Sequence, residues 1–127
     1  IEGLCYEVKL HSEAFKRAGM DIRALRAVGG GAQIDRQLQL KANITGLRVI
    51  KGAAAESSSA LGAAAYAACA MGVLDNPAEA YARIRGSEKV FYPDEEAYKK
   101  FDAQYEKYKR FADAVRMFER ARESRFF

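Results

Sequence analysis

The spacing of apolar positions along the chain predicts an alternation of helices and short strands. Apolar residues recur every three or four positions in helices and every second position in strands. On this basis we predict helices over residues 4–18, 33–45, 56–71, 77–84 and 94–122, and strands over residues 22–28 and 47–51. Residues 90–93 are predicted to form an extended link before the last helix.

The same spacing predicts which side chains are buried. In the first helix we expect Leu4, Val8, His11 and Phe15 to share a buried face, which makes His11 a core or interface histidine. In the second helix we expect Ile34, Leu38 and Ile44 to enter the core. The last helix has the clearest period, and its predicted buried seam consists of Tyr98, Phe101, Tyr105, Tyr108, Ala112 and Val115.

Glycine, serine and Asn-Pro residues mark the predicted helix ends. Gly19, Gly46 and Gly72 each follow a helical pattern and are expected to end it. Asn76-Pro77 is expected to start the fourth helix, and one of Ser57 to Ser59 to cap the third. The third helix is rich in small residues, and Gly62 inside it suggests a close neighbour.

The order strand–helix–strand–helix predicts an α/β fold in which a parallel pair of strands is joined by a right-handed crossover. We expect few parallel strands packed with helices and a long C-terminal helix. Two or three strands are too few for a well-covered sheet. We therefore expect the sheet to be completed by further residues outside this sequence or by a partner. The chain begins Ile1-Glu2-Gly3 and enters a helical pattern at once, which suggests a cut inside a larger protein.

Composition adds modest limits on the class of protein. With 127 residues, half of them apolar, the chain suits one domain with a real core. Cys5 and Cys69 have no CxxC partner and are expected to be buried, reduced thiols. We find no signal peptide and no apolar run long enough to cross a bilayer, so a cytoplasmic location without membrane contact is expected. The net charge of +4 is too mild, and the final helix too balanced in charge, to favour nucleic-acid binding.

The turn Gly29-Gly30-Gly31-Ala32 lies between a predicted strand and a predicted helix and is the strongest candidate for a ligand site. Glycine lets the backbone turn sharply and approach a ligand closely, and the following helix presents free N–H groups to phosphate. The turn lacks the GxGxxG and GK[ST] spacings of known phosphate loops. By itself it fits a tight strand-to-helix turn as well as a phosphate site.

A longer set of motifs resembles the C-terminal ATP-binding lobe of the FGGY carbohydrate kinases. The set is EGLCYE at residues 2–7, RAVGGGA at 26–32, Gln39, Ala42, Gly46, Glu56, ALGAA at 60–64, Ala68, Gly72 and VFYPD at 90–94 before a Tyr-rich helix. The motifs keep their order over nearly the whole chain, and the tail resembles pentulose kinases such as xylulokinase or ribulokinase. We therefore expect residues 1–127 to be the C-terminal portion of the kinase's C-terminal domain.

The resemblance implies an actin-like, ribonuclease H-like fold and transfer of the γ-phosphate of ATP, with Mg, to a sugar hydroxyl. It implies that Gly29, Gly30, Gly31 and Ala32 contact ATP or ADP through the backbone, around the α-phosphate and ribose. It places Asp35 near the ribose or adenine, and Glu56 and the ALGAA helix beside the site as support. The family's catalytic aspartate, phosphate-binding segment and sugar-binding lobe precede the matched region, so no catalytic residue and no metal ligand is assigned in this chain.

The sequence departs from the family pattern in the second helix. Gln33-Ile34 stands where Lys-Ser is common, Gln37 where Trp is common and Asn43 where Asp is common. Loss of the Ser removes a hydrogen-bond partner on the adenine side. The competing hypothesis is a non-catalytic module that binds no nucleotide and associates with itself through an exposed sheet edge or the aromatic helix.

Overall fold

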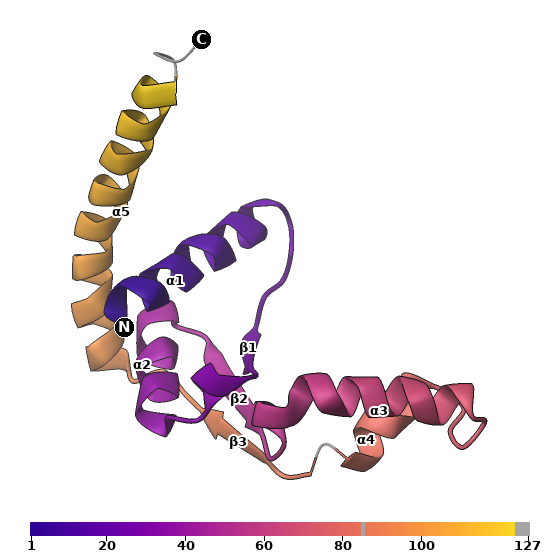
Figure 1. The fold of residues 1–127 in the computed structure, drawn as a ribbon. Helices are drawn as coiled ribbons and strands as arrows, with labels where there is room; N and C mark the ends of the chain where they lie inside the picture. The colour runs from indigo at the N-terminus through magenta and orange to yellow at the C-terminus, as the bar shows by residue number, and fades with distance from the viewer. Residues whose placement is uncertain (85, 124–127) are drawn as a thin grey trace.

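The computed structural model of the chain describes residues 1–84 and 86–123, which fold around one small sheet (Figure 1). The helices are α1 Glu2–Arg17, α2 Asp35–Thr45, α3 Ser58–Ala70, α4 Pro77–Ile84 and α5 Glu95–Glu123, with short 3-10 turns η1 Gly30–Ala32 and η2 Ala55–Ser57. The strands are β1 Ala24–Ala27, β2 Arg48–Gly52 and β3 Glu88–Phe91. In Figure 1, α1, α2 and α5 lie on one side of the strands, and α3 and α4 lie on the other.

The sheet is mixed, with the order β1-β2-β3. The predicted parallel pair is confirmed, because β1 runs parallel to β2 with Ala24 opposite Arg48. The predicted link over 90–93 is wrong in its first half: Val90 and Phe91 belong to β3, which pairs antiparallel with β2. This strand depends on hydrogen bonds to residues some forty positions away, which a four-residue apolar pattern does not reveal.

Helix α2 lies at the centre of the packing. Leu38 and Ala42 join a cluster with Val49 and Phe91 of the sheet, while Ile44 joins a second cluster with Tyr105 of α5. Leu38 and Ile44 are fully buried, as predicted. The prediction for Ile34 is wrong, since this residue precedes the helix, has an extended backbone and is 53% exposed.

Helix ends follow the glycines and Asn76. Gly19, Gly46 and Gly72 all have positive φ, which confirms them as helix stops. The Asn76 side chain accepts a hydrogen bond from the Glu79 amide at 2.9 Å and so caps α4, as predicted. The predicted serine cap of α3 is wrong: Ser57 makes no capping hydrogen bond, and the Ser58 hydroxyl donates backwards to the Ala55 carbonyl at 2.7 Å.

The predicted buried face of α1 is wrong. Leu4 is 68% exposed, Phe15 is 49% exposed, and His11 is also exposed. The buried residues are instead Cys5, Tyr6, Lys9 and Ser12. The helix turns this more polar stripe inward because α5 offers it tyrosine rings and a carboxylate, and α2 offers it Ile44.

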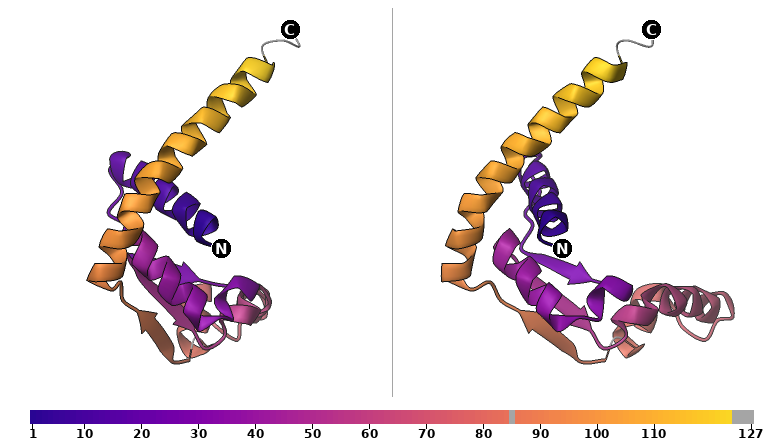
Figure 2. Two further views of the ribbon diagram at one scale, coloured as in Figure 1. Left: turned by 90° about the vertical axis from the view of Figure 1, so that its left-hand side faces the viewer. Right: turned by 60° about the vertical axis from the view of Figure 1, so that its left-hand side comes forward.

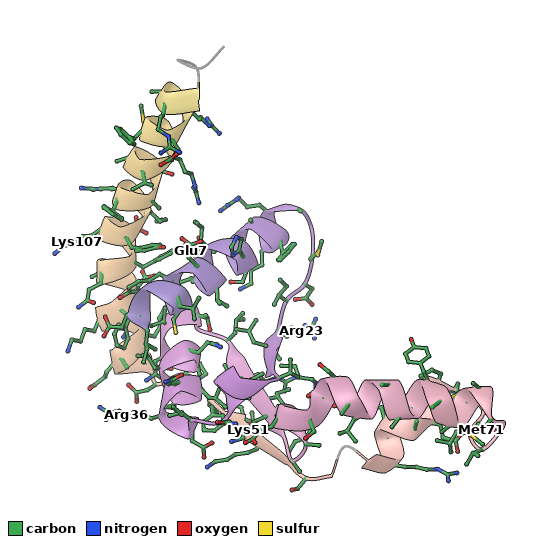
Figure 3. All side chains as sticks on the ribbon, viewed as in Figure 1. Glu7, Arg23, Arg36, Lys51, Met71 and Lys107 are labelled. Atoms are coloured by element: carbon green, nitrogen blue, oxygen red, sulfur yellow. The ribbon has the colours of Figure 1, made fainter. Side chains whose placement is uncertain are left out.

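The contact between α1 and α5 is built around a buried lysine. The Lys9 ammonium lies 2.6 Å from a carboxylate oxygen of Asp102, and 4.5 Å and 4.6 Å from the ring centres of Tyr98 and Tyr105. The Tyr105 hydroxyl donates to Glu13 at 2.9 Å. A salt bridge, two cation–π contacts and a hydrogen bond therefore replace the apolar packing that the sequence led us to expect. Figure 3 shows Glu7 on the α5 side of α1, where it accepts a hydrogen bond from Tyr108.

The aromatic seam of α5 is buried only in its first half. Tyr105 is 1% exposed, and Tyr98, Phe101 and Tyr108 are half-buried. Val115 is 43% exposed, so the prediction of a seam that is buried throughout is wrong there. Figure 2 shows the reason, because the second half of α5 extends past α1 and away from the sheet.

The tyrosines of this interface predict a loss of stability in alkali. Burial, and then the hydrogen bond to Glu13, raise the pKa of Tyr105 above its usual value. A raised pKa means that the folded chain favours the protonated phenol. Stability is therefore unaffected at neutral pH and falls as the pH rises past about 10, the ordinary tyrosine pKa. Urea unfolding between pH 8 and pH 11 would measure the fall in the free energy of unfolding, and Tyr105→Phe should make that fall smaller. The same dependence on pH in the wild type and in Tyr105→Phe would show that Tyr105 is not its cause.

Helix α3 is packed more loosely than its small residues suggest. A Cβ added at Gly62 would meet no atom within 4 Å in the described chain, so the expected close neighbour is not present. Ala65 is buried, whereas Tyr66 is 69% and Met71 80% exposed, and Figure 3 shows Met71 at the far end of the helix. Cys69 is half-buried, in contrast to the buried Cys5. Over residues 1–84 and 86–123, no helix is both long and apolar enough to cross a membrane.

Candidate functional site

The glycine turn forms where the parallel strands β1 and β2 end. After β1 the chain passes through Gly29, whose φ of 75° only glycine adopts easily, and then enters η1. The Gly29 amide donates to the Ala55 carbonyl at 2.7 Å, which ties the turn to η2 beyond β2. Ala32 ends η1 with no exposed surface and packs in the core cluster with Ala27 and Ala55. The turn is therefore anchored at both ends.

The middle of the turn faces outward. Gly30 and Gly31 are exposed, have no positive φ, and would accept a Cβ without meeting any atom within 4 Å. In the part of the chain that the structure describes, no acceptor takes a hydrogen bond from either amide. Two adjacent amides are thus free to donate just before the N-terminus of α2, where the helix dipole favours an anion.

Asp35 opens α2 directly after this turn. One oxygen of its carboxylate accepts a hydrogen bond from Lys51 at 3.1 Å, and the other accepts one from Lys89 at 2.6 Å. The hydrogen bonds from Lys89, and then from Lys51, hold the pKa of Asp35 below its usual value. Asp35 is therefore charged at neutral pH and already engaged by two cations.

Sequence reasoning missed both lysines. Lys51 could have been noticed, because it is a basic residue at the carboxyl end of the predicted strand next to the glycine turn. Lys89 had no such signal, since the strand that places it opposite Lys51 was not predicted. Figure 3 labels Lys51 where the strands approach the start of α2 and α3.

The other acidic candidates lie apart from these lysines. Glu56 is exposed in η2, and Asp75 is exposed in the loop before α4. Within the described residues, no group of three or more His, Cys, Asp or Glu side chains could hold a metal ion. The side chains present do not fit a magnesium site, and no step of the chemistry is assigned to one here.

A cavity of about 370 Å³ lies beside the turn, between the sheet and helices α3 and α4. Val28, Ala55, Leu61, Tyr66 and Tyr81 contribute to its walls, which are mainly apolar. Arg26 also lines it and bonds Glu88 of β3 at 2.8 Å, an interaction that raises the pKa of the arginine. The cavity meets the turn at Ala55, the residue that holds Gly29.

Residues 1–71 of the chain match the family model of the C-terminal domain of the FGGY family of carbohydrate kinases. The matched region contains α1, the glycine turn, α2 and α3. The chain belongs to the FGGY family of carbohydrate kinases. This confirms the resemblance seen in the sequence, and it makes the glycine turn a feature of a kinase domain.

Curated relatives in the FGGY family include several pentulose kinases. A xylulose kinase of Bacillus subtilis (strain 168) is 31% identical over 109 residues, which is 86% of this chain and 22% of the relative. A ribulokinase of Shouchella clausii is 34% identical over 122 residues, 89% of this chain and 21% of the relative. The chain thus spans about a fifth of the length of the FGGY kinases that it matches.

Solved structures of two kinases share the fold. A ligand-bound xylulose kinase from Lactobacillus acidophilus superposes with a TM-score of 0.63 at 24% identity, covering 72% of this chain and 18% of that one. A gluconate kinase from the same organism gives a TM-score of 0.62 at the same identity and coverage. The predicted α/β class, a partial actin-like, ribonuclease H-like domain with a long C-terminal helix, is confirmed. The sheet differs from the prediction only in its antiparallel third strand.

Proposed function

We propose that this chain supplies the nucleotide-holding turn of an ATP-dependent sugar kinase. The kinase would transfer the γ-phosphate of ATP, with magnesium, to a hydroxyl of a sugar. Membership of the FGGY family supports the reaction class. Pentuloses are the proposed substrate class, because the similar proteins include xylulose kinases and a ribulokinase.

The main support for this proposal is that Gly30 and Gly31 are exposed, have open space around them and donate their amides to no acceptor in the described residues. Gly29 must be glycine because of its positive φ, but neither the backbone nor any neighbour in the described chain demands glycine at the next two positions. Glycine there leaves room for a ligand to reach the backbone. Both amides are exposed and available to donate to an anion, as the α-phosphate contact requires.

Asp35 completes the proposed nucleotide contact, and Ala32 supports it. Ala32 has no exposed surface and its amide donates to the Gly29 carbonyl at 3.0 Å, so we propose that it anchors the turn without touching the nucleotide. The Asp35 side chain is 44% exposed and lies on the α2 side of the turn, where we propose that it neighbours the ribose or adenine. ATP and ADP both contain the α-phosphate, ribose and adenine that these residues are proposed to contact, so the proposal covers both nucleotides.

A valine at position 31 tests this proposal. Gly31→Val places a branched side chain in the open space over the turn, so we expect ATP affinity to fall at least tenfold while the fold is kept. Isothermal calorimetry with ATP and ADP would measure the affinity, and thermal unfolding would check the fold. Gly3→Val is a matched control, because Gly3 has equally open surroundings but lies in α1. Unchanged affinity in Gly31→Val would refute the proposed contact.

Phosphate transfer is not expected from this chain alone. Transfer needs a residue that orients the attacking hydroxyl and a clamp of metal and cationic groups on the phosphates. The acidic residue nearest the turn, Asp35, is engaged by two lysines. A coupled ADP-release assay with xylulose, ribulose and glycerol should show no turnover, and measurable sugar-dependent ADP release would contradict this prediction.

Self-association is the second candidate function, favoured by exposed apolar residues. Phe111, Val115 and Phe118 follow each other at helical spacing on α5 and are 66%, 43% and 68% exposed. In the sheet order of the described residues, β1 also has one edge without a neighbouring strand. Sedimentation of the wild type and of Phe118→Glu would separate the candidates, since only self-association predicts a dimer that the charge disrupts.

A further inference from the structure

Lys51 and Lys89 lie directly opposite each other on neighbouring strands. They are register partners in the antiparallel pair β2–β3. Like charges that face each other across a sheet repel, so this pair alone would weaken the sheet. The Asp35 carboxylate accepts a hydrogen bond from both ammonium groups, so three charges form one network across α2, β2 and β3.

Lys51 also reaches the residue that follows the glycine turn. Its ammonium group donates to the Gln33 carbonyl at 3.3 Å as well as to Asp35. Gln33 is the residue that follows η1, and its amide in turn donates to the Gly30 carbonyl. The Lys51 side chain is only 22% exposed, so it spans this distance as a packed and ordered group. One cation of the central strand therefore holds the end of the turn and the beginning of α2 together.

We propose that the Lys51–Asp35–Lys89 network is a positioning device that holds the amides of Gly30 and Gly31 in the arrangement that binds nucleotide. The inference rests on the proposed function of the glycine turn. Lys51 is the positioning residue, and it acts through the Gln33 carbonyl and through Asp35, the first residue of α2. Lys89 donates to the other oxygen of the Asp35 carboxylate from the edge strand.

A direct contact between Lys51 and the phosphates is the competing role, and it predicts the opposite effect at Asp35. If Lys51 bound phosphate directly, Asp35→Asn would release the lysine and tighten ATP binding. If the network positions the turn, the same change lets the turn move and weakens binding. Tighter binding would therefore exclude the positioning role. Weaker binding also follows if Asp35 contacts the ribose or adenine directly, so the effect of Lys51→Met, which leaves the Asp35 side chain in place, separates these two cases.

The test is a double-mutant cycle on the full chain, with ATP affinity measured by calorimetry. We expect Lys51→Met and Asp35→Asn each to weaken ATP binding about tenfold, and the double variant to be no weaker than either single one. Lys51→Arg keeps the charge and both contacts and should restore most of the affinity. Arg116→Met is the control, since it removes an ion pair with Asp113 on the far part of α5. Tighter binding by Asp35→Asn, additive losses, or unchanged affinity would each overturn the inference.

A ligand-free measurement keeps this inference separate from the proposed function. In nuclear magnetic resonance spectra of the unliganded chain, the amide resonances of Gly30 and Gly31 should shift in Lys51→Met and return towards their wild-type positions in Lys51→Arg. If the wild type binds no ATP, the proposed function fails, while these spectra still report whether the network holds the turn. Unchanged glycine amides in Lys51→Met would overturn the positioning role even if ATP binds.

Discussion

Replacing Gly46 with alanine is expected to lower the free energy of unfolding by about 2–5 kcal/mol. Two costs combine at this position. Gly46 has a φ of 68°, where an L-residue costs about 1–2 kcal/mol. Its added Cβ would also lie 2.7 Å from the Cε2 atom of Tyr98, which forces the ring to move at a cost of about 1–3 kcal/mol. Urea unfolding followed by circular dichroism measures the change.

Gly19 provides the matched control for this variant. It also ends a helix with a positive φ of 89°, but an added Cβ would meet no atom within 4 Å. Gly19→Ala should therefore show the backbone cost alone, about 1–2 kcal/mol. Adding Tyr98→Ala to Gly46→Ala should remove the steric part of the loss. Equal losses in Gly19→Ala and Gly46→Ala would show that the Tyr98 contact does not matter.

Truncating Tyr105 should have an effect of similar or larger size. The side chain is 1% exposed, its ring stacks on Tyr6 with 5.9 Å between ring centres, and its hydroxyl donates to Glu13. Tyr105→Ala leaves a cavity between α1, α2 and α5 and removes the partner of a carboxylate, so we expect a loss of about 3–5 kcal/mol. Because α5 then has less to pack on, amide exchange along Glu95–Tyr108 should also become faster.

An exposed tyrosine supplies the control for this second prediction. Tyr66 is also in a helix but is 69% exposed, so Tyr66→Ala should change stability by no more than about 0.5 kcal/mol. Tyr105→Phe separates the hydroxyl from the ring, and it should retain most of the packing energy. If Tyr105→Ala cost no more than Tyr66→Ala, the interface of α1 and α5 described above would be wrong.

The local parts of the fold could be predicted from the sequence. Gly19, Gly46 and Gly72 end helices because only glycine takes the positive φ that each stop requires, and that signal lies in one residue. The parallel pair β1–β2 follows from the order of elements along the chain. Leu38 and Ile44 were predicted as core from their positions in the helical pattern, and both are buried because α2 packs on both of its neighbouring layers.

The buried face of α1 could not be predicted in the same way. Its apolar period fits the stripe of Leu4 and Phe15 better than the stripe that contains Lys9. Lys9 is buried because Asp102 and two tyrosine rings, all about ninety residues away in sequence, compensate its charge. Spacing reports how apolar residues recur, but it says nothing about which distant partner a polar residue meets.

In the candidate site, too, features built from neighbouring residues could be predicted, and features built from distant residues could not. The glycine turn was visible in the sequence because its chemistry is in consecutive residues. The ion network was not visible, because Lys51, Lys89 and Asp35 come together only when β3 pairs with β2. The role of Asp35 as a neighbour of the ribose or adenine stays a prediction, and its two lysine partners are the new observation.

The hydrogen bonds between α2 and the segment before α5 bear on where a folding unit ends. Gln39 donates to the Tyr92 carbonyl at 2.7 Å, and Asn43 accepts from the Asp94 amide at 3.0 Å. Both partners lie beyond residue 71, where the match to the family model stops. A boundary drawn where the family model ends would therefore remove support from α2, the helix that follows the glycine turn. The region that the family model matches is shorter than the region that packs together.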